Sequence, residues 1–148
     1  MKHERRKART LALLVLYEVD CVDHQPQEVI TRHLQDQQSL GEEALDFVQR
    51  LVTGALKFAP EIDRLIAGCA PEWPVAELAV LDRNILRLAL WEFAIAGETP
   101  LKVAINEAVE LAKRFSSDSA PRFINGVLGT LAQREGDIRR QFQPSGLG

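Results

Sequence analysis

The stretch that decides the fold runs from Pro100 to Leu131 and reads PLKVAINEAVELAKRFSSDSAPRFINGVLGTL. Apolar residues recur at three- and four-residue steps on both sides of a polar break at 116–119, which is the spacing of one face of a helix. These apolar positions are Ala104, Ala108, Leu111, Ala112 and Phe115 before the break, and Ile124, Val127, Leu128 and Leu131 after it. The stretch therefore predicts a hairpin of two helices, whose apolar faces need a further apolar surface to pack against.

Local signals place the ends and the exposed side of this hairpin. Thr99 is a good N-cap residue, and Pro100 and Pro121 both suit the first turn of a helix, where a missing N–H costs nothing. Glu110 and Arg114 stand four residues apart and predict a favourable ion pair on the exposed side. We therefore expect the first helix of the hairpin to be capped by Thr99.

Helical apolar spacing also covers most of the rest of the chain. The expected helices run over about 4–20, from Pro26, from Gly41, from Pro60 and over 75–96, with a turn around Trp73 between Pro71 and Pro74. No run alternates apolar and polar residues over a useful length, so strands are not expected. The sequence predicts an all-α fold of about seven helices in a single domain.

The segment 75–96 is close to apolar all round, because only six of its 22 residues are polar. A membrane-spanning helix would not tolerate four of those six between Asp82 and Arg87. The pattern favours a central helix that is covered on most sides and ends at Gly97. Its expected contacts with the hairpin come from Leu81, Ile85, Leu88 and Ala89.

Length and composition fit one globular domain. A chain of 148 residues can bury enough surface for a core without disulfides or metal. Cys21 and Cys69 stand far apart, outside any Cys-x-x-Cys spacing, and are interpreted as thiols of a reducing cytoplasm. The sequence shows no signal-peptide pattern, so we expect a cytoplasmic protein that does not engage a membrane. We expect a helical domain over 1–140 and a flexible tail over 141–148.

The amino-terminal end is strongly basic in a chain whose formal net charge is −3. Residues 1–9 carry five cations, Lys2, Arg5, Arg6, Lys7 and Arg9, against the single acid Glu4. On the expected first helix, Arg5, Arg9, Leu13 and Tyr17 follow one another in a row displaced from the apolar stripe of Ala8, Leu11, Ala12, Val15 and Val19. A solvated basic face would explain this row, but the density of cations favours an exposed strip that binds phosphate groups.

Patterns typical of catalysis or metal binding are not found in the sequence. It has no Gly-rich phosphate loop, no nucleophile elbow and no clustered set of His, Cys, Asp and Glu. His24 and His33 are expected at the surface and not as metal ligands. Gly126 and Gly129 lie within one helix and predict a close contact with another helix. We therefore expect no enzyme, no catalytic residue, no metal and no cofactor.

Three motifs resemble those of the bacterial transcription antitermination factor NusB family. The hairpin segments VAINEAVELAKRF (103–115) and RFINGVLG (122–129) strongly resemble the family signature. LDRNILRLALWE (81–92) is similar to its central-helix motif, with Trp91 where a tyrosine is usual. RRKAR (5–9), followed by Leu11-Ala12 and Leu16-Tyr17, is similar to its arginine-rich first helix. Together these motifs cover both ends and the middle of the chain.

The resemblance implies an all-helical, non-catalytic RNA-binding factor. Members of the family pair with NusE, a small-subunit ribosomal protein, and bind the boxA element of nascent RNA. With RNA polymerase and other Nus factors they suppress premature termination, notably on ribosomal RNA operons. The implied RNA contacts are Lys2, Arg5, Arg6, Lys7, Arg9 and Tyr17. The implied NusE-facing residues are Asp82, Phe115, Ser119 and Phe123, with Ser119 where the family often carries an aspartate.

Two other functions are compatible with the residues. One is a helical adaptor whose basic end binds an acidic protein. The other is the NusB-like domain attached to some ribosomal RNA methyltransferases, for which this chain is too short to include the methyltransferase domain. A base-stacking Tyr17 beside arginines suits RNA better than an acidic protein. The sequence leaves open whether the free protein is a monomer or a homodimer.

Overall fold

The computed structural model describes residues 2–22, 24–35, 40–69 and 75–142, apart from the side chains of Lys2 and Ala76. Within these ranges it contains eight α-helices and no strand. They are α1 (Lys2–Val22), α2 (Pro26–Gln35), α3 (Glu42–Lys57), α4 (Ala59–Cys69), α5 (Val80–Leu90), α6 (Leu101–Phe115), α7 (Ala120–Ala132) and α8 (Glu135–Gln141). A 3₁₀ turn, η1 (Val75–Glu77), precedes α5, and a π-helical segment, η2 (Trp91–Ile95), follows it. The all-α prediction is confirmed.

The helix beyond the expected seven or so is α8, whose sequence EGDIRRQ is too polar to show apolar spacing. Ile138 alone is buried, and Arg139 Nε donates a hydrogen bond to the carbonyl oxygen of Phe93 at 3.0 Å. Directly after α8, the ring of Phe142 meets Phe58 edge-on at 5.7 Å between centroids. Residues 143–148 of the expected tail, and the turn expected around Trp73, lie outside the described residues.

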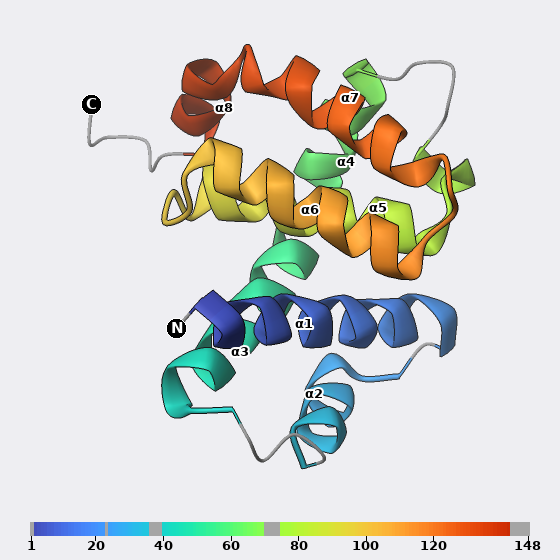
Figure 1. The fold of residues 1–148 in the computed structure, drawn as a ribbon, viewed down its shortest axis with the longest axis vertical. Coiled ribbons are helices and arrows are strands. Elements are labelled where there is room, and N and C mark those ends of the chain that lie inside the picture. Colours follow the sequence, from blue (N-terminus) through green and yellow to red (C-terminus); the bar gives the residue numbers. More distant parts are fainter. Residues whose placement is uncertain (1, 23, 36–39, 70–74, 143–148) are drawn as a thin grey trace.

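Helix α5 occupies the centre of the fold. Figure 1 shows α5 and α6 between α1 on one side and α7 on the other. Helix α5 contacts α1, α3, α4, α6 and α7, and every residue from Asn84 to Leu90 is buried. The prediction of a central helix is confirmed, although Leu81 near its start is only half-buried. None of the helices in the described part of the chain has the length and apolar character needed to cross a membrane.

The prediction of one continuous helix over 75–96 is wrong at its start. Residues 75–77 form η1, and α5 begins only at Val80. At the other end the helical backbone continues through η2 and ends before Gly97, which has a φ of 67°. A positive φ costs little for glycine because it has no Cβ, so Gly97 ends the helix as predicted.

The close helix contact that glycine allows lies at Gly54 in α3. A Cβ at this position would stand 2.0 Å from the Trp91 indole nitrogen, so only glycine lets α3 approach the ring. Gly126 and Gly129 are exposed, and a Cβ on either would meet nothing within 4 Å. The expectation of a close contact at those two glycines is therefore wrong.

Helices α6 and α7 form the predicted hairpin. All of the predicted apolar positions are buried except Phe115, which is half-buried at the end of α6. Both helices contact α5, which supplies the further apolar surface that the hairpin requires. Part of the fold that positions the functional surfaces is thus encoded in local spacing.

Thr99 does not cap α6, contrary to the prediction. Helix α6 begins at Leu101, the N-cap position is Pro100, and no side chain caps it. Thr99 is instead buried, and its hydroxyl donates a hydrogen bond to Glu92 Oε1 at 2.7 Å. A buried carboxylate needs hydrogen-bond donors. The Thr99 hydroxyl donates to Glu92 and is therefore not available to cap α6.

The predicted ion pair between Glu110 and Arg114 is also wrong. Glu110 pairs instead with Lys113, the residue before Arg114, whose ammonium group lies 3.7 Å from the Glu110 carboxylate. The Arg114 guanidinium reaches across to α1, where its Nη1 donates to Thr10 Oγ1 at 3.2 Å. The exposed side of α6 is therefore connected to α1 by a hydrogen bond from Arg114 to the uncharged hydroxyl of Thr10.

Candidate nucleic-acid interface

Helix α1 is buried along more of its circumference than its sequence suggests. The predicted stripe is confirmed at Ala8, Leu11, Ala12 and Val15, which are all buried, whereas Val19 is only half-buried. Leu13, expected on the exposed strip, is fully buried as well. The reason is that α2 and α3 pack against α1 in addition to α5. The exposed side of α1 is therefore narrower than the predicted strip.

Arg9 lies inside the protein, so its placement on an exposed strip is wrong. Its Nε and Nη2 donate to the two carboxylate oxygens of Glu92, each at 2.8 Å. Its Nη1 donates to Glu107 Oε1 at 3.2 Å, and the guanidinium lies 5.3 Å from the Phe47 ring centroid. Only 6% of Arg9 is exposed. This bidentate geometry with charge-assisted bonds ties α1 to η2 and α6.

Two more of the predicted RNA contacts are engaged by carboxylates. Arg5 Nη2 lies 3.2 Å from Glu43 Oε1, and its guanidinium stands 4.5 Å from the centroid of Phe47. Arg6 Nε donates to Glu107 Oε1 at 3.0 Å. The Arg6 side chain is nevertheless 52% exposed, whereas that of Glu107 is 9% exposed. Arg6 is thus anchored at its Nε while its outer end faces solvent.

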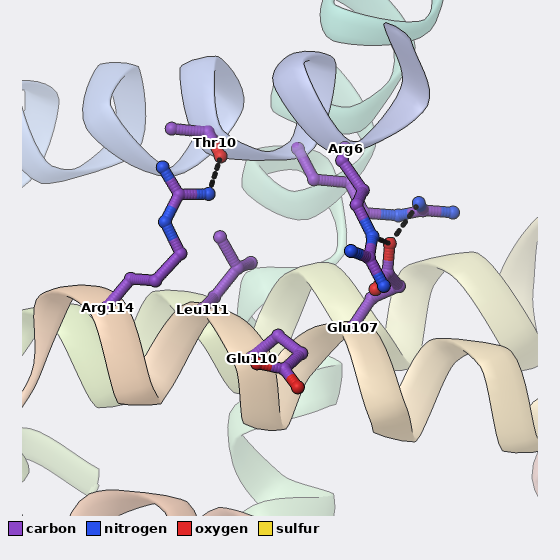
Figure 2. A pocket seen from close by; sticks show the side chains of 7 residues that line it. Arg6, Thr10, Glu107, Glu110, Leu111 and Arg114 are labelled. Carbon is purple, nitrogen blue, oxygen red and sulfur yellow. Dashed lines mark hydrogen bonds and ion pairs between the residues drawn. The ribbon is translucent and has the colours of Figure 1, made fainter. Parts of the chain in front are cut away.

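A hollow of about 340 Å³ lies where α1 faces the end of α6. We call it the basic hollow, and its lining residues are His3, Arg6, Lys7, Thr10, Leu11, Leu14 and Arg114. No carboxylate belongs to this lining. A smaller recess of about 70 Å³ beside it, shown in Figure 2, contains Glu107 and Glu110. Arg6 and Arg114 therefore line both spaces, and only the smaller one contains carboxylates.

Tyr17 extends the exposed side of α1 beyond the basic hollow. It follows Leu14 by three residues, which places both on one side of the helix. Its exposed fraction is 43%, one of the largest among the apolar and aromatic side chains that the structure describes. Lys7 is exposed, while the side chain of Lys2 lies outside the described residues. Of the predicted RNA contacts, the structure thus brings Arg6 and Lys7 together at the basic hollow, with Tyr17 further along the exposed side of α1.

Arg114 is the functional candidate that the sequence did not indicate. It lies on α6, far from the basic amino terminus in sequence, and only the packing of α6 beside α1 places it at the basic hollow. Its position in VAINEAVELAKRF predicted nothing but a helical ion pair with Glu110. A signal for it could come only from knowing which helices are neighbours.

A second hollow gathers three of the four predicted partner-facing residues. We call it the partner groove, with a volume of about 330 Å³, and its lining residues are Glu77, Leu78, Ala79, Asp82, Ser119, Ala120 and Phe123. Asp82 comes from α5, whereas Ser119 and Phe123 come from the start of α7. Phe123 is half-buried, as expected for an aromatic side chain that can still meet a partner. The groove combines two acids, Glu77 and Asp82, with apolar side chains.

Phe115 is not part of the partner groove. It is half-buried at the end of α6, with the Arg114 guanidinium 5.0 Å from its ring centroid. Ser116, its neighbour, donates a hydrogen bond from its hydroxyl to Asp82 Oδ1. That bond connects the end of α6 to Asp82, one of the two acids of the partner groove.

His24 and His33 both meet a carboxylate of α1. His24 Nδ1 lies 3.0 Å and His33 Nε2 3.3 Å from the carboxylate of Glu18, which also accepts a hydrogen bond from Arg32. The bond from Arg32, followed by that from His24, lowers the pKa of Glu18 from 4.5 to about 2. The described residues contain no group of three or more His, Cys, Asp and Glu side chains that could hold a metal ion.

These surfaces define a class of protein. The protein is a bundle of helices with a structural polar network, and the described residues form a basic hollow and an acidic–apolar groove. Such an arrangement is that of a helical binding domain with separate surfaces for an anionic and a partly apolar partner.

Comparison with known proteins identifies the family. The NusB family model matches residues 6–133, so the chain belongs to the NusB family. A transcription antitermination protein NusB from Roseiflexus sp. (strain RS-1) is 47% identical over 138 residues, covering 92% of this chain and 96% of that protein.

Comparison with solved structures gives the same family. The chain resembles T. maritima NusB with a TM-score of 0.82 and 29% identity, covering 88% of this chain and 92% of that one. It also resembles a chain in a crystal structure of the antitermination factors NusB and NusE in complex with dsRNA. That likeness has a TM-score of 0.81 and 27% identity, covering 90% of this chain and 99% of the other.

Proposed function

We propose that this protein is a transcription antitermination factor that binds boxA-type RNA together with the ribosomal protein NusE. In this role it joins RNA polymerase and other Nus factors in the cytoplasm and supports transcription of ribosomal RNA operons. Residues 1–140 form the RNA-binding domain, and the protein works by binding and not by catalysis. The names of its relatives and the NusB–NusE–dsRNA structure support this assignment.

The observation that carries the proposal is the basic hollow. A chain with a formal net charge of −3 has on α1 a space lined by cations and apolar side chains and by no carboxylate. RNA phosphates are attracted to such a space, and each phosphate contact releases counterions. The lining thus favours RNA in a protein that would otherwise repel it.

Arg6, Lys7 and Tyr17 are the direct RNA contacts in this proposal, and Lys2 and Arg5 of the same helix are proposed as further contacts. Arg6 and Lys7 bind phosphates at the hollow, and Tyr17, further along the same side of α1, stacks on a base. Arg9 has a different role, because its guanidinium is used by Glu92 and Glu107 inside the protein.

NusE docks at the partner groove. Asp82 supplies a charge that attracts a basic side chain of the partner, while Phe123 supplies apolar area. Ser119 lines the same groove without a charge, and Phe115 contributes from the end of α6 outside it. The groove is separate from the basic hollow, so RNA and NusE can be bound together.

Binding of a boxA-containing single-stranded RNA, with and without the NusE homologue, tests the proposal. Affinity for this RNA should exceed that for a scrambled RNA of the same length and should rise when NusE is present. Phe123→Ala should weaken the NusE complex more than Phe115→Ala, because Phe115 lies outside the groove. A protein that binds NusE or an acidic protein but no RNA would be an adaptor.

A further inference from the structure

The cations at the basic hollow differ in how far the protein itself already uses them. The Nε of Arg6 donates a hydrogen bond to Glu107. Among the residues that the structure describes, no carboxylate lies within ion-pair distance of Lys7 or Arg114. The partner of Arg114 is the uncharged hydroxyl of Thr10, at 3.2 Å. Lys7 and Arg114 therefore keep their full charge available to an anion.

Arg114 also stands opposite the α1 cations and not among them. Figure 2 shows its side chain rising from α6 toward Thr10 on α1, about one turn along from Arg6. Arg6, Lys7 and Arg114 all line the basic hollow, so it has cations on two walls that come from different helices. A phosphate between two walls meets donors from both sides, which a single exposed helix face cannot provide.

Resting on the RNA-binding function proposed above, we propose that Arg114 forms the second wall of a phosphate clamp. The ligand is the phosphodiester backbone of single-stranded RNA, seated between Lys7 and Arg6 on α1 and Arg114 on α6. Leu11 and Leu14 line the same hollow and accept the less polar sugar and base edges. The bond between Arg114 and Thr10 holds the guanidinium at the hollow before RNA arrives.

The alternative role for Arg114 is structural, as a clip between α6 and α1. Its hydrogen bond to Thr10 is exposed, and no carboxylate completes it. A clip would depend on that bond, whereas a phosphate contact depends on the charge. Variants that separate charge from hydrogen bond therefore distinguish the two roles.

The experiment measures binding of the full chain to a boxA-containing single-stranded RNA over a salt series. Arg114→Gln should flatten the slope of log K against log salt by about 0.7, the value for one lost contact on a single strand. Arg114→Lys should keep the wild-type slope, because the charge remains. Thr10→Val, which removes the hydrogen bond but no charge, should also keep the slope.

Lys113→Ala is the matched control, because Lys113 is the adjacent cation on α6, pairs with Glu110 and does not line the hollow. Its slope should equal that of the wild type. If Arg114→Gln and Lys113→Ala give the same slope while Lys7→Gln flattens it, the clamp is wrong and the proposed function stands. If the wild type binds no RNA, the proposed function fails and the clamp with it. If Arg114→Gln impairs only the binding of an acidic protein, the clamp is likewise overturned.

Discussion

Arg9 and Lys7 stand two residues apart on α1, yet one is part of the core and the other is part of the basic hollow. Arg9 is held by Glu92 and Glu107 and is 6% exposed, whereas Lys7 faces solvent at a hollow without carboxylates. The amino-terminal run of cations is therefore not one site. Carboxylates on η2 and α6 decide which cation stabilises the fold and which can bind RNA.

The largest effect is expected for removal of the buried member of this pair. Arg9→Ala leaves Glu92 buried without its bidentate partner, so the free energy of unfolding should fall by about 3–5 kcal/mol. Urea denaturation measures the loss. Arg5→Ala is the control, because its pair with Glu43 is exposed and should cost at most about 1 kcal/mol. Equal losses would mean that Arg9 is no more structural than Arg5.

Tyr17 tests whether an exposed side chain of α1 contacts RNA without contributing charge. If its ring stacks on a base, Tyr17→Ala should weaken RNA binding by ~1–3 kcal/mol while leaving the salt dependence unchanged. Fluorescence anisotropy at several salt concentrations separates the two quantities. Tyr17→Phe keeps the ring and should bind almost as well as the wild type. A flattened salt slope in Tyr17→Ala would show that the ring acts through the cations and not by stacking.

Lys7 tests the charge of the hollow with a smaller change. Lys7→Gln should reduce the slope of log K against log salt by about 0.7, one single-strand phosphate contact. Its melting temperature should match that of the wild type, since Lys7 is exposed. Thermal unfolding followed by circular dichroism checks this expectation. A destabilised Lys7→Gln protein would remove the distinction between Lys7 and Arg9.

The smallest effect is expected at Glu18, which is the acid of an ion-pair cluster with His24, Arg32 and His33 at the surface of α1. Its pKa is lowered to about 2 in the folded protein from 4.5, so it stabilises the fold above about pH 4.5 and loses this contribution as the pH falls toward 2. Glu18→Gln should therefore show a flatter fall of unfolding free energy over this range. Parallel pH profiles for the two proteins would show that the cluster does not favour the folded state.

Features that depend on local spacing could be predicted from the sequence. The hairpin of α6 and α7, the central position of α5 and the end at Gly97 follow from apolar periodicity and a glycine signal. The chain turned polar near α8, so that helix was missed, although Ile138 and Phe142 attach it to the rest of the fold.

Features that depend on which helices are neighbours could not be predicted. Arg9 turns inward because Glu92 and Glu107, more than eighty residues away in sequence, meet it in the core. Arg114 reaches the basic hollow for the same reason, through the packing of α6 beside α1. In contrast, Asp82, Ser119 and Phe123 were selected by resemblance alone, and the structure shows that they line one groove.

The contact between Gly54 and Trp91 restricts the order in which these two positions can mutate. While Trp91 is present and 8% exposed, any side chain on Gly54 would overlap the indole, so a substitution there meets a barrier. If Trp91 is first replaced by a smaller residue, the space opens and position 54 becomes permissive. The two substitutions are thus strongly epistatic, and evolution or library design can reach the double variant along one path only.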